Sequence, residues 1–238
     1  MRDDKEDCGK SKHREKMIIP KITALVPMKG HSERVPHKNI RQLVDRPACH
    51  WVLGKLNDCK YIDEIIVDTD DEEIAEVAKP FEKVKVIPRP EFLLGDMVGI
   101  QPLIEYDMSQ SRNDFFLQTH STNPCVKPET YVKAIEAFFS QKEHDALFSV
   151  TEIKSRFYWP DGRGINHDPR HLIRTQDLEP IYEENSCFYL FSREVNERVK
   201  NRLGDNPMMY PIDALEAADI DYMDDFYWCE FLLSREQK

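Results

Sequence analysis

The stretch that decides the fold is Ile22–Ile40, ITALVPMKGHSERVPHKNI, in which an apolar strand runs directly into a glycine-containing loop. The loop carries Lys29, Arg34 and Lys38, and Glu33 is the acidic residue among them. The whole chain of 238 residues has a formal net charge of -11. A local excess of cations in an acidic protein indicates that this loop binds an anion.

Composition limits the possible classes of protein. A chain of this length with 40% hydrophobic residues can bury the core of one large domain, or of one domain with an insertion. The acidic balance disfavours nucleic acid as a partner. No run approaches the roughly 18 apolar residues of a membrane span, and no signal peptide is visible. We therefore expect a cytoplasmic protein whose six scattered cysteines are free thiols, most of them packing residues.

The apolar pattern alternates between strands and helices after a polar start. Residues 1–16 are almost wholly polar and charged, which predicts a disordered, flexible tail. Beyond the tail, alternation of the two periods predicts an α/β fold with a mainly parallel sheet. The expected elements of the first half are a strand at 22–27, a helix at 47–56, a strand at 64–68, a helix at 70–79 and a strand at 83–87.

The helix expected after the second strand has local signals of its own. Thr69 and Glu72 have the spacing of a capping box, which would begin the helix. Ile74, Val77 and Ala78 share one face of a helix, so we expect this face to pack against the sheet.

The pattern continues to about residue 150 and is then interrupted. Between residues 151 and 183, prolines and glycines break any long periodic element, which predicts an insertion. The core is therefore expected to comprise residues 17–150 and 184–238. Its later elements are a strand at 114–118, a helix opened by Pro128 with Val132, Ile135, Phe138 and Phe139 facing inward, strands at 146–150 and 187–191, and a helix at 224–235.

Polar residues gather where the expected strands end. Four clusters have this position: Lys29–Asn39, Asp68–Asp71, Gln118–Asn123, and Asp219 with Asp221. Because ligands of open parallel sheets bind beyond the carboxyl ends of the strands, we expect the clusters to share one site.

The first loop has the composition of a phosphate-binding loop. Gly30 allows a close approach of the backbone, Ser32 supplies a hydroxyl donor, and the three cations supply charge. The loop has neither the GxGxxG spacing of dinucleotide-binding proteins nor the GxxxxGK[ST] spacing of the P-loop. A solvated cationic loop without a ligand is the alternative.

Asp219-Ile220-Asp221 places two carboxylates on the same side of an extended segment, because alternate residues of a strand share a face. Oxygen ligands at this spacing suit Mg²⁺, which binds one or two carboxylates together with substrate phosphates. The alternative is that the acids of this region, which include Asp224 and Asp225, only add charge to the first turn of the following helix.

With these motifs in this order, the chain resembles the CMP-sugar synthetases, particularly the acylneuraminate cytidylyltransferases (CMP-N-acetylneuraminic acid synthetases). The likeness covers roughly residues 17–233. The family's loop, P-A-R-x-G-S-K-R-I-P-x-K-N, is matched by Pro27, Gly30, Ser32, Arg34, Pro36, Lys38 and Asn39. Further similar segments are VDTDDEEIAEVA (67–78), Arg89-Pro90 with Asp96, LQTHSTNP (117–124), QDLEPIYEEN (176–185) and ADID (218–221).

The resemblance implies a three-layer, Rossmann-like nucleotidyltransferase fold. It implies that CMP is transferred from CTP to the anomeric hydroxyl of a 2-keto-3-deoxy sugar acid, with release of pyrophosphate. The resemblance places Lys29, Gly30, Ser32, Arg34 and Lys38 near the phosphates of CTP, and Asn39 and Arg89 near its cytosine or ribose. It places Gln118 and Tyr189 at the sugar, and Asp219 and Asp221 as ligands of Mg²⁺. The catalytic residues that it implies are Arg34, Asp219 and Asp221.

The resemblance also implies a homodimer, in which the insertion at 151–183 reaches the partner's sugar pocket. Phe157, Tyr158 and Trp159 are the aromatic residues expected in such an interface. The alternative is that they cover a small core within the insertion.

Four positions depart from the family pattern. Lys29 replaces an arginine and so lacks its bidentate fork, and Glu33 replaces a lysine beside the phosphates. Thr175 and Glu183 replace arginines on the sugar side. Three alternatives therefore stay open: a different nonulosonate as substrate, a CMP-octulosonate (KDO) synthetase or related sugar nucleotidyltransferase, or a catalytically silent module that senses nucleotide.

Overall fold

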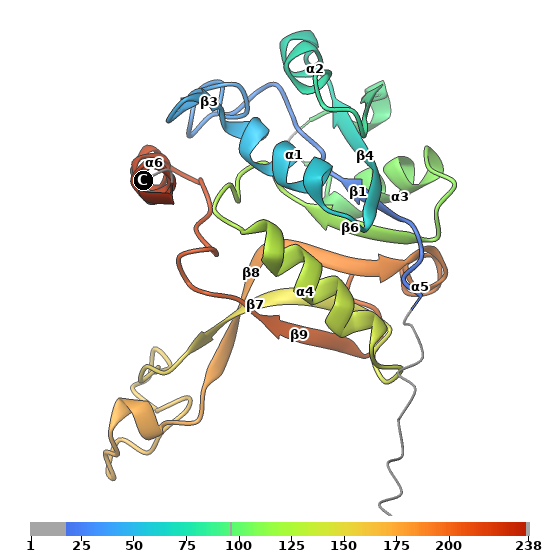
Figure 1. Cartoon of the computed structure of the whole chain (residues 1–238). Helices are drawn as coiled ribbons and strands as arrows, with labels where there is room; N and C mark the ends of the chain where they lie inside the picture. Colours follow the sequence, from blue (N-terminus) through green and yellow to red (C-terminus); the bar gives the residue numbers. More distant parts are fainter. Residues whose placement is uncertain (1–17, 96, 237–238) are drawn as a thin grey trace, which may run out of the picture.

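The computed structural model describes residues 18–95 and 97–236, and within them the chain forms a seven-stranded sheet with the order β5-β4-β1-β6-β8-β7-β9 (Figure 1). Six of these strands run parallel to one another, and β8 runs antiparallel to both of its neighbours. The strands are β1 (Ile22–Leu25), β4 (Ile62–Thr69), β5 (Val84–Pro88), β6 (Phe115–Thr119), β7 (Ala146–Ile153), β8 (Ile181–Ser192) and β9 (Pro207–Pro211).

Helices cover both faces of the sheet, which gives three layers. On one face, α1 (Ala48–Asp58), α2 (Glu72–Ala78) and α4 (Pro128–Phe139) bury their apolar sides against β1, β4 and β6. On the other face, α3 (Ile100–Ser109) packs over a separate cluster that includes Phe116 and Tyr189. A hydrogen bond from Gln101 to Asn196 joins α3 to α5 (Arg193–Val199). The predicted three-layer α/β class is confirmed.

The last helix, α6 (Met223–Glu236), lies at one end of the sheet, beside α1 and the first loop (Figure 1). Its Phe226, Cys229 and Leu233 form a buried cluster with Val35 of the loop and Trp51 of α1. Burying Val35 anchors the middle of the loop against α1 and α6.

The expected strands and helices are all present, and the structure adds elements that the pattern did not predict. These are α3, α5, β9, the short helices η1 (Glu91–Leu93) and η2 (Thr175–Asp177), and a hairpin of β2 (Gln42–Leu43) and β3 (Arg46–Pro47). The inward face expected for α4 is confirmed, with Ile135 and Phe138 buried and Val132 and Phe139 partly buried. The expected disordered tail lies outside the described residues.

The predicted capping box of α2 is wrong. Thr69 belongs to β4, and Asp71 is the N-cap residue. Its Oδ1 accepts hydrogen bonds from the amides of Glu73, at 2.8 Å, and Ile74, at 3.0 Å. Thr69 instead accepts a bond from the amide of Asp71 and so fixes the residue that caps the helix.

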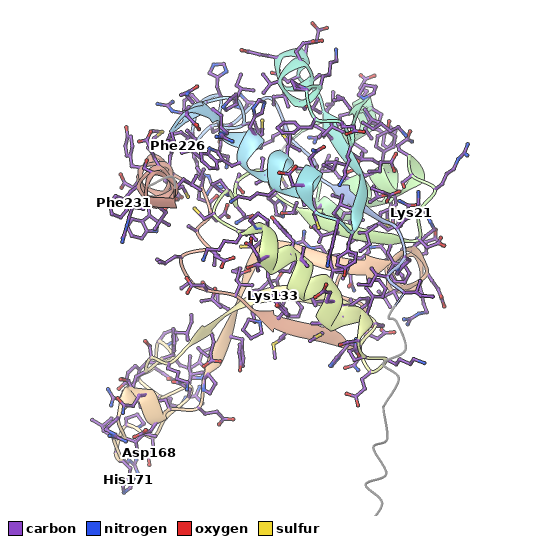
Figure 2. The ribbon with its side chains drawn as sticks, in the orientation of Figure 1. Lys21, Lys133, Asp168, His171, Phe226 and Phe231 are labelled. Atoms are coloured by element: carbon purple, nitrogen blue, oxygen red, sulfur yellow. The ribbon has the colours of Figure 1, made fainter. Side chains whose placement is uncertain are left out.

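Residues 151–183 project away from the sheet as an arm (Figure 1). Pairing of β7 with β8 continues to Ile153 and Ile181, and a short bridge joins Tyr158 to Gly164 beyond it. Asp168 and His171 lie at its far end (Figure 2). At the base of the arm the register of β7 and β8 shifts, and Ser186 there has a left-handed φ of 56°. Such a bulge bends a strand.

The five cysteines among the described residues are buried and form no disulfide, as expected. No helix in the described part of the chain is long and apolar enough to cross a membrane.

Candidate active site

Hydrogen bonds connect the four polar clusters beyond the strand ends. The amide of Gly30 donates to Oδ1 of Asp70 at 2.7 Å, which joins the first loop to the segment after β4. Ser121 donates to Oδ1 of Asn39 at 2.6 Å, which joins the loop to the segment after β6. The first three clusters thus form one continuous structure around the loop.

The fourth cluster is held by its backbone. Ile220 is fully buried, and its amide donates to the carbonyl of Thr122 at 2.9 Å. Its own carbonyl accepts a bond from Nζ of Lys38 at 2.8 Å. Arg34 donates to Asp221 at 2.6 Å. These contacts bring all four polar clusters together, as the sequence predicts.

A cavity of about 660 Å³ opens above the loop. Its cationic wall consists of Lys29, Arg34 and Lys38, and Glu33 lies among them. Burial, together with the charges of Arg202 and Lys38, lowers the pKa of His120 to about 4, so this imidazole is neutral at physiological pH. The cavity's positive charge therefore comes from the loop. Its described lining is Pro27, Met28, Lys29, Ser32, Glu33, Arg34, Lys38, Asn39, His120, Ser121 and Thr122.

Asp219 has the properties of a cation ligand. Burial is the main cause that raises the pKa of its carboxyl, and Lys38 opposes that rise. Its Oδ1 is buried and has no hydrogen-bond partner in the described part of the chain. The described residues contain no group of three or more histidines, cysteines or acids that could hold a metal. A pair of carboxylates completed by substrate phosphates fits Mg²⁺, and the unpartnered oxygen of Asp219 is suited to that role.

Arg89 faces a second cavity, of about 440 Å³, between the end of β4 and the segment after β5. Its side chain is 7% exposed and donates from Nε to Oδ1 of Asp68 at 3.0 Å. Thr69, Asp70 and Asp71 also line this cavity. Asp70 lines the second cavity and also accepts the hydrogen bond from the amide of Gly30, so this cavity lies next to the start of the first loop.

Gln118 and Tyr189 are neighbours across β6 and β8, and both are fully buried. Arg202 covers them: its guanidinium lies 3.5 Å from the centre of the Tyr189 ring and donates to the side-chain oxygen of Gln118. The hydroxyl of Tyr189 donates to a carboxylate oxygen of Glu184 and accepts a hydrogen bond from the hydroxyl of Ser186 at 3.0 Å. The two expected sugar residues are therefore brought together beneath an arginine.

Comparison with known proteins supports one family. A family model described as cytidylyltransferase matches residues 23–237. The chain belongs to the cytidylyltransferase family. The resemblance drawn from the sequence is therefore confirmed at the level of the family.

Curated members of the cytidylyltransferase family are similar over most of the chain. N-acylneuraminate cytidylyltransferase A of Danio rerio is 29% identical over 207 residues, which are 83% of this chain and 47% of that protein. Pseudaminic acid cytidylyltransferase of Campylobacter jejuni (strain 81-176) is 29% identical over 180 residues, 71% of this chain and 77% of that protein. The chain spans less than half the length of the fish relatives that it matches, from Oncorhynchus mykiss and Danio rerio.

A solved structure shares the fold of this cytidylyltransferase family member. CMP:2-keto-3-deoxy-manno-octonic acid synthetase complexed with CTP has a TM-score of 0.69 and 14% identity, and covers 91% of this chain and 99% of that one. At this identity the likeness concerns the fold alone.

Three residues of this family member that the sequence did not single out belong to the site region: His120, Arg202 and Asp107. Arg202 follows α5 and is distant in sequence from the residues that it covers. His120 lay inside a recognised cluster but without a role. Asp107 lies on α3, whose other buried residues are Leu103, Ile104 and Met108. Helical spacing already puts Asp107 on that apolar face, which was the available signal.

Replacing Gly30 with alanine tests how closely the loop contacts α2. An added Cβ would lie 2.6 Å from Oδ2 and 2.7 Å from Cβ of Asp71, the N-cap residue. We expect Gly30→Ala to weaken the cap and lower the free energy of unfolding by about 1 kcal/mol. We also expect weaker binding of CTP. Urea denaturation and calorimetric titration measure the two effects.

Gly99→Ala is the matched control, because a Cβ at Gly99 would meet no atom of the described residues within 4 Å. Equal behaviour of the two variants in both measurements would show that the contact between Gly30 and Asp71 is unimportant.

Proposed function

We propose that the protein transfers CMP from CTP to the anomeric hydroxyl of a 2-keto-3-deoxy sugar acid of the nonulosonic type, with release of pyrophosphate. The observation that carries this proposal is the junction of Lys38 with the Asp219–Asp221 segment, which brings phosphate-binding cations beside a carboxylate pair. The names of the curated relatives support the same reaction.

The nucleotide is assigned to the loop side of the site. Lys29, Ser32, Arg34 and Lys38 contact the triphosphate, and Gly30 allows it to approach the backbone. Asn39 and Arg89 are assigned to the cytosine or ribose. Asn39 suits this role because its amide donates to the carbonyl of Lys29 and accepts from Ser121, so its orientation is fixed before a ligand arrives.

The reaction is an in-line substitution at the α-phosphorus of CTP. The anomeric oxygen of the sugar forms the new P–O bond, and the bond to pyrophosphate breaks. Asp219 accepts the hydroxyl proton, and a carboxyl whose pKa is raised by burial is a stronger base. Arg34 and Lys38 stabilise charge on the phosphate oxygens. Asp219 and Asp221 are the residues that would hold Mg²⁺, which supplies charge neutralisation at the phosphates.

The sugar is assigned to the region of Gln118 and Tyr189. Beside it, a cavity of about 340 Å³ at the base of the arm contains Asp219, Glu183 and Glu184. These acids disfavour a carboxylate in that cavity unless a cation is added. A second copy whose arm reaches this cavity would supply a cation, because the arm carries the exposed arginines Arg163 and Arg174. Tyr158 and Trp159 on the arm are about half exposed and so are open to a contact with a second copy. The homodimer and the cytoplasmic location stay predictions.

A panel of 2-keto-3-deoxy sugar acids tests the proposal, with pyrophosphate release from CTP as the measurement. Release with nine-carbon acids supports it. Release with eight-carbon acids alone would favour an octulosonate synthetase. Binding of CTP without release on any acid would favour the sensing module, which Glu33 in the cavity motivates.

A further inference from the structure

A pair of buried carboxyls lies behind Arg89. Asp107 of α3 and Asp68 of β4 are both fully buried, and they are close enough for each carboxyl to act on the pKa of the other. Among the described residues, no group donates to either oxygen of Asp107 or to Oδ2 of Asp68. If both groups were ionised, oxygen atoms that can only accept would face one another in the core, which is unfavourable. If the pair holds one proton, the protonated carboxyl donates a hydrogen bond and the ionised carboxylate accepts it.

The charges of the surroundings also require that proton. Arg89 is the cation opposite the pair, and it donates to Asp68 from Nε and, at 3.3 Å, from Nη2 to the Asp68 carbonyl. One guanidinium balances one carboxylate, so a second ionised carboxyl would leave an uncompensated buried charge. Asp70 adds a further negative charge near Asp68.

The proton belongs to Asp107. Burial, followed by the charge of Asp68, raises the pKa of Asp107 to about 9, and Arg89 opposes this rise. Burial also raises the pKa of Asp68, but Arg89 opposes that rise through both its charge and its hydrogen bond. Asp68 is therefore the carboxylate of the pair, and Asp107 is neutral at physiological pH.

The pair fixes a side chain that lines a cavity. The described hydrogen bonds of Arg89 use Nε and Nη2, both directed at Asp68, which leaves Nη1 for a ligand. We propose that Asp107 is a positioning residue for the nucleotide: its protonated carboxyl donates to Asp68, and Asp68 in turn holds Arg89 at the cavity where CTP binds. This inference rests on the proposed function, because it assigns Arg89 to the nucleotide.

Ionisation of Asp107 would undo this arrangement. Two negative carboxyls would then repel one another and compete for Arg89, which would move from its place at the cavity. Asparagine at this position can still donate to Asp68 through Nδ2 and cannot ionise. Leucine has a similar size but leaves Oδ2 of Asp68 without a donor.

Calorimetric titration with CTP, without a divalent metal, tests the proposal in the wild type, Asp107→Asn and Asp107→Leu. Measurements extend from neutral pH to beyond the pKa of about 9. We expect the wild type to lose affinity beyond that pH and Asp107→Asn to lack this additional loss. We expect Asp107→Leu to bind about tenfold more weakly at every pH, as expected for one unsatisfied buried polar group. Burial lowers the pKa of Lys38, so its deprotonation also weakens CTP binding as pH rises. This loss of affinity is common to all three proteins.

Infrared difference spectra of wild type and Asp107→Asn provide a measurement that does not depend on CTP. A band of a protonated carboxyl at neutral pH in the wild type alone is expected, and its absence would overturn the shared proton. Identical pH profiles of CTP binding in the wild type and Asp107→Asn would overturn the positioning role. If the wild type does not bind CTP at all, the proposed function fails, and the positioning role fails with it.

Discussion

Replacing Asp219 with asparagine is expected to lower CTP-dependent pyrophosphate release by about a thousandfold, which is the size of effect that follows from removing one electrostatic group at a reacting phosphate. The asparagine keeps the shape of the side chain but supplies neither a negative ligand nor a base. Because burial makes the charge of Asp219 unfavourable in the folded state, we expect the free energy of unfolding not to fall. Initial rates and urea denaturation measure the two quantities.

Asp221 and Asp224 provide the comparison. Asp221→Asn is expected to reduce the rate as well, because it loses a carboxylate and breaks the 2.6 Å ion pair with Arg34. Asp224 lies in the first turn of α6 and is exposed, so we expect the Asp224→Asn variant to release pyrophosphate at the wild-type rate. Full activity of Asp219→Asn would contradict the assignment of the acid pair.

Asp107→Asn is expected to change how stability depends on pH. The folded state keeps the proton of Asp107 up to about pH 9, whereas the unfolded chain loses it near the ordinary aspartate pKa of 3.8. The contribution of this group is therefore fully present below the unfolded pKa and is lost as pH rises through the folded pKa. Within that window the free energy of unfolding of the wild type should fall by up to about 1.4 kcal/mol per pH unit relative to Asp107→Asn.

Urea denaturation at several pH values measures this slope. Asp114→Asn is the control, because it makes the same substitution at a side chain that is 83% exposed. Parallel curves for the wild type and Asp107→Asn would show that Asp107 is ionised in the folded protein.

The sequence contained enough information to locate the site but not all of its residues. The loop of Gly30 to Asn39 was recognisable because it follows an apolar strand, and parallel strands end at the same edge of the sheet. The acids at 219 and 221 were recognisable by their alternate spacing. That the four clusters converge is confirmed by their hydrogen bonds. The individual roles of these residues stay predictions.

The remaining residues depended on packing between distant elements. Arg202 lies over Tyr189 because the chain after α5 folds back across β8, and no local pattern indicates this. The cap of α2 was assigned wrongly because β4 extends to Thr69, which moves the start of the helix. The length of a strand depends on its partners in the sheet, so a short sequence motif could not settle it.

The connection between Arg34 and Asp221 also has a consequence for folding. These residues are 187 positions apart in the sequence. Lys38 and Ile220, which also share a hydrogen bond, are 182 positions apart. Contacts between such distant segments form late, because closing a long loop must precede any gain from the contact. During synthesis, the first loop therefore emerges from the ribosome long before the segment that completes its site. Until α6 docks on Val35, the nascent chain has a sheet but no assembled acid pair.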